Sequence, residues 1–264
     1  MNISFNIVAI AFAAFVSFPE AGFAADAAPV APSTPNAFTG NVTLASEYLY
    51  RGIAQTNGKA ALQGGFDYAH TSGAYVGVWG SSISWLGDIG PGISAPLELD
   101  VYGGYKSSFA GGDWSYDVGV LTYNYPGTYP SGFTKADTTE IYGAIGWKFV
   151  SIKYSSVVSN HIFGFATPTG GKTRGSAYTD LTLNHDFGNG WGVSAHAGHQ
   201  TIKDFGDASY TDYRLGVTKD LGFGSVGLSL SSTNAKGGAG QPYRNTFNRD
   251  LGDERIVVSF TKTL

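Results

Sequence analysis

The sequence predicts an all-β protein, a closed antiparallel transmembrane β-barrel of about twelve strands, with short turns at one rim and long loops at the other. Three observations predict it. Segments of about ten residues alternate apolar and polar side chains, and the gaps between these segments alternate in length. Charged residues make up only 14% of the chain, whereas a soluble domain typically carries ~25%. Beyond the N-terminus we expect no membrane-spanning helix, because no run of about 20 apolar residues occurs there.

The N-terminal part is predicted to be processed and flexible. Residues 1–24 form a predicted signal peptide, with an apolar core at 3–18 and small residues for cleavage after Ala24. An anchoring helix is the alternative, but Asn6 interrupts the run and the run is short for a membrane span. Residues 25–40 hold three prolines and almost no charge, which predicts a flexible periplasmic leader. The barrel domain is therefore expected at 41–264.

Strands are expected wherever the period of two holds. In the last segment Ile256, Val258 and Phe260 share one parity, and polar residues share the other. The chain ends with this strand, so we expect it to pair with the first strand and close the sheet. The predicted strands are 41–51, 60–70, 74–83, 97–106, 113–125, 138–147, 150–158, 176–187, 191–200, 210–219, 224–233 and 255–264.

The gaps predict two different rims. Short turns at one rim and long loops at the other are typical of an outer-membrane barrel, with the short turns on the periplasmic side. An even strand count brings both termini to that side. The two longest gaps, 159–175 and 234–254, are the candidates for folding inward. The short gaps are 71–73, 107–112, 148–149, 188–190 and 220–223, and the long ones are 52–59, 84–96, 126–137, 159–175, 201–209 and 234–254.

The direction of the two faces follows from the charge content. A soluble barrel would bury the apolar face and would need a dense charged coat, for which 14% charge is thin. A membrane barrel turns the apolar face to lipid and carries aromatic girdles near the strand ends. We therefore favour the membrane barrel. The predicted girdle residues are Tyr48, Tyr50, Tyr68, Trp114, Tyr116, Trp147, Trp191 and Tyr213.

The charged residues of the other parity are predicted to line a pore. Together with Asp117 and Arg255, the set holds nine acidic and five basic residues, which predicts a mild preference for cations. Glu47 and Arg51 share parity in the first predicted strand, either as an electrostatic element of the pore or as a structural ion pair with Asp67. The predicted pore-lining residues are Glu47, Arg51, Asp67, Glu98, Asp100, Lys106, Glu140, Lys153, Asp180, Asp186, Asp212 and Arg214.

Residues 46–83 resemble the opening of the TorF family of porin-like outer-membrane proteins of proteobacteria. The matching pieces are Ser46-Glu47-Tyr48, Arg51-Gly52, Gln55-Thr56, Gln63-Gly64-Gly65-Phe66-Asp67-Tyr68, His70, Ser72-Gly73 and Gly77-Val78-Trp79. At the other end, 255–259 and Lys262 also resemble that family, while Leu264 stands where barrels commonly end in Phe. The resemblance implies a porin-like barrel in the outer membrane of a Gram-negative bacterium. Its expected partners are outer-membrane lipid, the barrel-assembly machinery (through the C-terminal strand) and small hydrophilic solutes.

Other binding and cofactor classes lack support in the sequence. A net charge of −4 gives no case for nucleic acid, and the absence of Cys excludes disulfides and thiolate chemistry. Residues 222–227 match GxGxxG, but they lie between two predicted strands rather than between a strand and a helix. Residues 166–173 lack the first Gly of a phosphate loop, and no helix follows. We expect no cofactor, no metal ion and no catalytic residue.

Two alternatives to a channel stay open. An outer-membrane hydrolase needs a Ser and a His at the lipid boundary, whereas Ser194 and His196 share the lumen parity. His161 and His199 are expected near the outer rim without an acidic partner by spacing. The other alternative is a plugged structural or adhesive barrel, because about twelve strands lie between about 8, where side chains fill the interior, and 16, where a channel is open.

Overall fold

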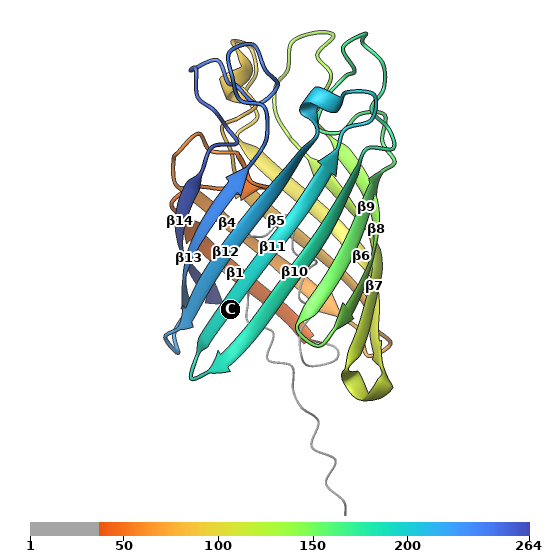
Figure 1. Cartoon of the computed structure of the whole chain (residues 1–264), viewed down its shortest axis with the longest axis vertical. Helices are drawn as coiled ribbons and strands as arrows, with labels where there is room; N and C mark the ends of the chain where they lie inside the picture. The colour runs from red at the N-terminus through yellow and green to blue at the C-terminus, as the bar shows by residue number, and fades with distance from the viewer. Residues whose placement is uncertain (1–36) are drawn as a thin grey trace, which may run out of the picture.

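The computed structural model describes residues 37–264, which form a closed antiparallel barrel of twelve strands (Figure 1). This confirms the predicted fold class. Each strand pairs with its neighbours along the chain, and β14 closes the barrel on β1, where Thr43 lies opposite Thr261. The wall strands are β1 (Ala37–Ala45), β4 (Ala61–Ala69), β5 (Ala74–Ser82), β6 (Leu97–Phe109), β7 (Trp114–Asn124), β8 (Thr138–Trp147), β9 (Val150–Val157), β10 (Ala177–Gly188), β11 (Trp191–Thr201), β12 (Tyr210–Asp220), β13 (Ser225–Thr233) and β14 (Arg255–Thr263).

The two rims differ as the gap lengths predicted. At the lower rim in Figure 1, turns such as 148–149 and 189–190 join the strands. Asn189 and Gly190 adopt φ values of 53° and 77°, as a two-residue hairpin turn requires. The long connections, which carry the 3-10 helices η1 (Gly87–Ile89) and η3 (Gly206–Ala208), gather at the upper rim. A third, η2 (Ala110–Gly112), lies in the turn between β6 and β7. The C-terminus lies at the short-turn rim, where the Leu264 amide donates to the Gly40 carbonyl at 2.8 Å.

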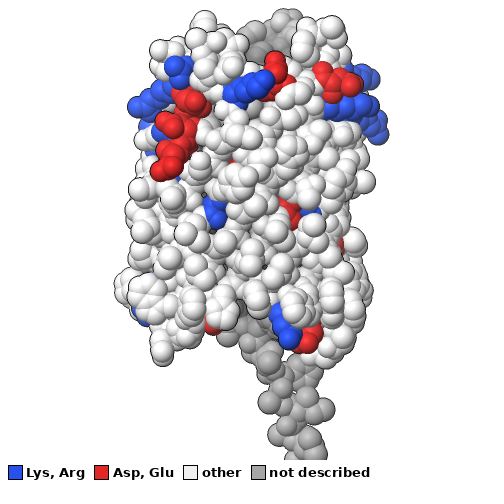
Figure 2. Space-filling view, in the orientation of Figure 1, with Lys and Arg blue, Asp and Glu red and all other residues white. Residues whose placement is uncertain are grey.

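The outer surface of the wall is apolar. Leu215, Leu228 and Ile256 are 56%, 52% and 67% exposed, while their strand neighbours face inward. Figure 2 shows a broad, mostly uncharged belt, with charged residues gathered near the loop rim and a smaller group near the short turns. Six of the eight predicted girdle residues lie on this outer surface: Tyr68, Trp114, Tyr116, Trp147, Trp191 and Tyr213. Among the described residues, no helix is long and apolar enough to cross a membrane.

The first strand departs from the prediction at both ends. β1 begins at Ala37 rather than at residue 41 and ends at Ala45, after which the chain leaves the wall. Residues 46–60, which we call the lumen segment, enter the barrel and include a small hairpin of β2 (Leu49–Tyr50) and β3 (Ile53–Ala54). The hairpin reverses because Arg51 and Gly52 have positive φ values of 46° and 76°, a conformation that suits Gly. The predicted signal peptide (1–24) and most of the predicted leader (25–40) lie outside the described residues.

Two predictions about this segment are wrong. Tyr48 and Tyr50 are not girdle residues, because both lie inside the barrel, at 0% and 7% exposure. Glu47 and Arg51 do not share a strand. Apolar and polar residues continue to alternate after Ala45, which is why this stretch was predicted as part of the wall. In the structure it lies inside the barrel, where side chains of the wall bind its polar groups.

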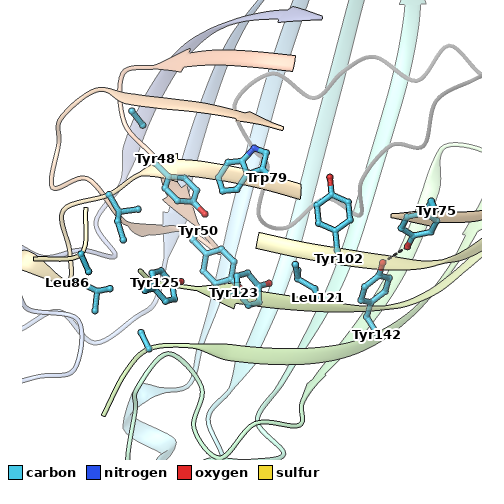
Figure 3. Packing of buried hydrophobic residues seen from close by; sticks show 14 of the residues in the cluster. Tyr48, Tyr50, Tyr75, Trp79, Leu86, Tyr102, Leu121, Tyr123, Tyr125 and Tyr142 are labelled. Atoms are coloured by element: carbon cyan, nitrogen blue, oxygen red, sulfur yellow. Dashed lines mark hydrogen bonds between the residues drawn. The ribbon is translucent and has the colours of Figure 1, made fainter. Parts of the chain in front are cut away.

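Two buried clusters fill the barrel from the lumen segment upward. Tyr48 and Tyr50 pack with Trp79, Tyr123 and Tyr125 of the wall and loops, as Figure 3 shows. At the loop rim, Ile53 packs with Ile162 and Tyr243. These last two residues come from loops 159–175 and 234–254, so both loops that were predicted to fold inward bury a side chain there.

Candidate functional site

The lumen segment is anchored across the barrel by Arg51. Its Nη1 and Nη2 donate to the two carboxylate oxygens of Glu140 on β8, at 3.1 and 2.9 Å. Nη1 also donates to Gln200 Oε1 on β11 at 2.7 Å. The guanidinium lies over the rings of Tyr178 and Tyr50, 4.1 and 4.8 Å from their centroids. A bidentate, charge-assisted pair of this kind is among the strongest polar contacts in proteins, so the hairpin tip is fixed to the far wall.

Tyr48 provides a second anchor for the same segment. Its hydroxyl donates to Glu98 Oε1 on β6 at 2.7 Å, and its ring meets Trp79 edge-on at 5.6 Å. Burial and the nearby negative charge of Glu98 raise the pKa of Tyr48 well above its usual value, so the hydroxyl stays protonated. Gly52 lies so close to Asp212 of β12 that a Cβ would stand 3.0 Å from its side chain. The segment therefore fits tightly against the wall.

Carboxylates gather where these anchors meet the wall. Glu98 and Asp100 on β6 and Glu140 on β8 are 1%, 2% and 1% exposed. Asp100 lies within electrostatic range of both glutamates, and its Oδ1 is buried without a hydrogen-bond partner among residues 37–264. Arg51 meets this group of carboxylates through its two bonds to Glu140.

A second network lies on β10–β12. His196 Nδ1 is 2.8 Å from Asp180, and Nε2 is 2.7 Å from Asp212. Carboxylates only accept hydrogen bonds, so both ring nitrogens must carry a proton and the imidazole is charged. Tyr178 also donates to Asp212, at 2.9 Å. Asp180 and Asp212 are buried inside the barrel, and the sequence did not reveal that one imidazole, that of His196, bridges them.

Tyrosines organise the part of the lumen near the short turns. Tyr102 donates to Asp67 Oδ1 and Tyr75 donates to Asp117 Oδ1, each at 2.6 Å. The hydroxyl of Tyr75 also bonds that of Tyr142, as Figure 3 shows.

Two lysines complete this layer. Lys106 and Lys153 lie over the rings of Tyr75 and Tyr142, with Nζ 5.7 and 4.5 Å from the centroids. All these side chains come from β4–β9, so one half of the wall carries the aromatic and charged groups of this layer.

The opposite part of the wall is lined by small hydroxyl side chains. On β13 the residues Ser225, Ser229 and Ser231 are buried toward the inside, and Thr43 Oγ1 meets Thr261 Oγ1 at 2.7 Å across the β1–β14 seam. Small polar groups leave more room in the lumen than the tyrosines of β4–β9 do. The interior is thus polar all round and asymmetric.

The remaining predicted residues occupy different places. Glu47 lies in the lumen segment, where Oε1 accepts from the Gly58 amide at 2.6 Å and Oε2 is 3.9 Å from Arg255 Nε. The predicted ion pair of Glu47 and Arg51 with Asp67 is wrong, because these three residues have other partners. Asp186 is exposed at the short-turn rim and accepts from the Gly188 amide at 2.6 Å. Arg214 lies on β12 opposite His196, half-buried.

The histidines do not form a hydrolytic arrangement in the described part of the chain. Both nitrogens of His196 are engaged by carboxylates, so neither is left to accept a proton from Ser194. His199 faces outward, with Nδ1 2.9 Å from Thr211 Oγ1. Over residues 37–264, no group of three or more His, Asp or Glu side chains is arranged to hold a metal ion.

A closed barrel with an apolar exterior, a polar interior and rims of unequal loop length defines the class of protein: a porin-like barrel of the outer-membrane type. The chain belongs to the family described as "Bacterial protein of unknown function (Gcw_chp)", whose model matches residues 29–264. No curated protein sequence matches the chain.

Among solved structures, the fold is similar to those of two porins. The KdgM porin has 7% sequence identity and a TM-score of 0.52, covering 85% of this chain and 98% of its own. The NanC porin has 9% identity and a TM-score of 0.53, covering 86% and 98%. A structure of the KdgM porin in complex with disordered oligogalacturonate has 8% identity and a TM-score of 0.50, covering 86% and 98%. At these identities the likeness shows the fold alone.

Proposed function

We propose that the protein is an outer-membrane channel of a Gram-negative bacterium for the passive diffusion of small hydrophilic solutes or ions, with the lumen segment as its constriction. The observation that carries this proposal is a lumen lined on every side by charged or hydroxyl side chains behind an apolar exterior. Such an interior is suited to water, whereas the exterior is suited to lipid. The resemblance of residues 46–83 to the TorF family supports the same function. Residues 1–24 would serve as the signal peptide for export.

We further propose a mild preference for cations. Glu98, Asp100 and Glu140 face one guanidinium at the constriction, and Asp100 Oδ1 has no hydrogen-bond partner in the part of the chain that the structure describes. Fixed carboxylates in a narrow pore lower the energy of a passing cation and raise that of an anion. The His196 network contributes less to selectivity, because its charged ring offsets one of its two carboxylates.

Planar-bilayer recordings on the refolded, mature chain test both proposals. We expect discrete conductance steps and, in a salt gradient, a reversal potential of the sign for cations. The double variant Glu98→Gln with Asp100→Asn should move the reversal potential toward that of a non-selective pore. The control Asp186→Asn, at the exposed short-turn rim, should move it less. An unchanged reversal potential in the double variant would remove these carboxylates from the selectivity mechanism.

A barrel plugged by the lumen segment, without transport, is the second candidate function. It is favoured by the burial of Tyr48 and Arg51, at 0% and 3% exposure. Replacing 49–54 by a short Gly-Ser linker separates the two functions. If a folded wild-type barrel stays silent while the linker variant conducts, the native protein is a plug and the channel proposal is wrong.

A further inference from the structure

A cavity of about 370 Å³ opens among the loops above the lumen segment. Its floor is the hairpin itself, with Tyr50, Ile53 and Gln55, and Gln200 of β11 lies beside them. Aromatic walls come from four different loops and the start of β12, and they are formed by Trp85, Tyr125, Phe163, Phe165, Tyr243 and Tyr210. The cavity is thus separate from the carboxylates of the constriction.

Ring contacts hold the walls in place. Phe163 meets Tyr50 edge-on at 5.1 Å, Trp85 meets Tyr125 at 5.6 Å, and Tyr210 meets Tyr243 at 5.1 Å. The hydroxyl of Tyr243 donates to the Ala208 carbonyl at 2.5 Å. A cavity whose walls already contact one another is largely pre-formed, which reduces the ordering required when a ligand binds.

The polar groups at this cavity specify an uncharged ligand. Asp88 and Arg244 bring opposite charges, and each has a partner already: Asp88 Oδ2 accepts from Ser84 at 2.8 Å, and Arg244 Nε donates to Asn248 at 3.0 Å. Gln55 and Asn245 also line the cavity. Each side-chain amide has two N–H groups and gives one to a protein acceptor, Gln55 to the Ile53 carbonyl at 2.9 Å and Asn245 to Asn57 Oδ1 at 3.1 Å. The other N–H group of each amide can donate to an acceptor on a ligand.

We propose that this cavity binds a small, uncharged aromatic compound that carries a hydrogen-bond acceptor. Aromatic walls favour stacked or edge-on contacts with another ring, and the volume is at the lower end of the range of about 300–1,000 Å³ for small-molecule sites. The site exists whether or not the barrel conducts, so this proposal does not depend on the proposed channel function.

The test uses 4-nitrobenzyl alcohol, a neutral aromatic compound whose nitro group accepts hydrogen bonds and quenches indole fluorescence at short range. We expect saturable quenching of the folded full barrel in lipid nanodiscs, above a linear background from partition into lipid. Trp85→Phe should abolish the saturable part. Trp114→Phe, which removes an exposed indole at the start of β7, near the short-turn rim, should leave it intact.

Affinity is tested at a wall residue that is not the reporter. Phe165→Ala should weaken the saturable phase at least tenfold, and Phe165→Leu provides a milder variant if the alanine variant does not fold. Quenching that is only linear, or that saturates equally without Trp85, would overturn the proposal. Displacement of the probe by methyl β-glucoside at a lower concentration than by benzyl alcohol would overturn the choice of an aromatic ligand.

Discussion

Removing the Arg51 guanidinium should release the lumen segment and open the barrel. In Arg51→Met the side chain keeps much of its length but loses the two bonds to Glu140, at 3.1 and 2.9 Å, and the bond to Gln200 at 2.7 Å. Glu140 then remains buried, near Asp100, without its cation. The substitution therefore destabilises the docked hairpin, which loses its main polar contacts with the wall. It does not destabilise a displaced hairpin, which does not form these contacts.

The size of the effect follows from the burial of the pair. Both side chains are 2% exposed, and breaking a buried ion pair by removing one partner costs about 3–5 kcal/mol. Each 1.4 kcal/mol or so is a factor of ten in an equilibrium. The ratio of displaced to docked hairpin should therefore rise by roughly two to three and a half orders of magnitude.

Single-channel recording measures this ratio as the fraction of time spent at a higher conductance level than that of the docked barrel, and urea unfolding in lipid vesicles measures the accompanying loss of stability. Glu140→Gln is the matched variant. As a single change it keeps a hydrogen-bond acceptor for Arg51. Combined with Arg51→Met in a double variant, it removes the carboxylate charge that Arg51→Met alone would leave unpaired. The double variant should lose less unfolding free energy than the sum of the losses in the two single variants. A coupling energy below about 0.5 kcal/mol in this cycle, or a silent and fully stable Arg51→Met barrel, would refute the assignment of Arg51 as the anchor.

Three further outcomes are expected. Tyr48→Phe removes the 2.7 Å bond to Glu98 and should lower the unfolding free energy by about 1–3 kcal/mol in urea titrations, and an unchanged value would show that the bond contributes nothing. Gly198→Ala places a Cβ 2.9 Å from Cε2 of the buried Tyr178 and should cost about 1–3 kcal/mol, whereas Gly206→Ala, with no atom within 4 Å, should be neutral in the same titration. Leu228→Arg on the outer surface should lower the unfolding free energy in vesicles by ~2–4 kcal/mol, whereas Phe223→Arg in a rim turn should lower it by only ~0–1 kcal/mol. Equal losses in the two variants would contradict a lipid-facing belt.

The wall of the barrel could be predicted because every strand obeys the same local rule. A side chain such as Leu228 faces outward and its neighbour Ser229 faces the lumen, so a period of two persists for the full length of a strand. The lengths of the gaps between strands were enough to predict which connections lie at the short-turn rim and which at the loop rim. The prediction failed after Ala45, because the lumen segment buries both of its sides, and alternation then no longer reports a wall position.

The candidate site could be predicted only in part. Parity correctly placed Glu98, Asp100 and Glu140 inside the barrel, but it carries no information about partners. Arg51 finds Glu140 and Gln200 at separations of 89 and 149 residues, and no local pattern encodes such a pairing. One signal was present: Arg51 is followed by Gly52, and a Gly inside an apparent strand indicates a turn or a close backbone approach.

The position of the lumen segment directly after β1 has a consequence for the order of assembly. Thr43 and Thr261 meet at the seam across 218 residues, and contacts with such separations form late, because chain entropy must be overcome first. The bonds of Arg51 to Glu140 and Gln200 form only once β8 and β11 are in place. Yet the segment must be inside before the seam closes, since a finished wall is open only at its rims. Closure of the seam and docking of the segment thus belong to one slow kinetic step, and a change at Arg51 should delay refolding as much as a change at the seam itself.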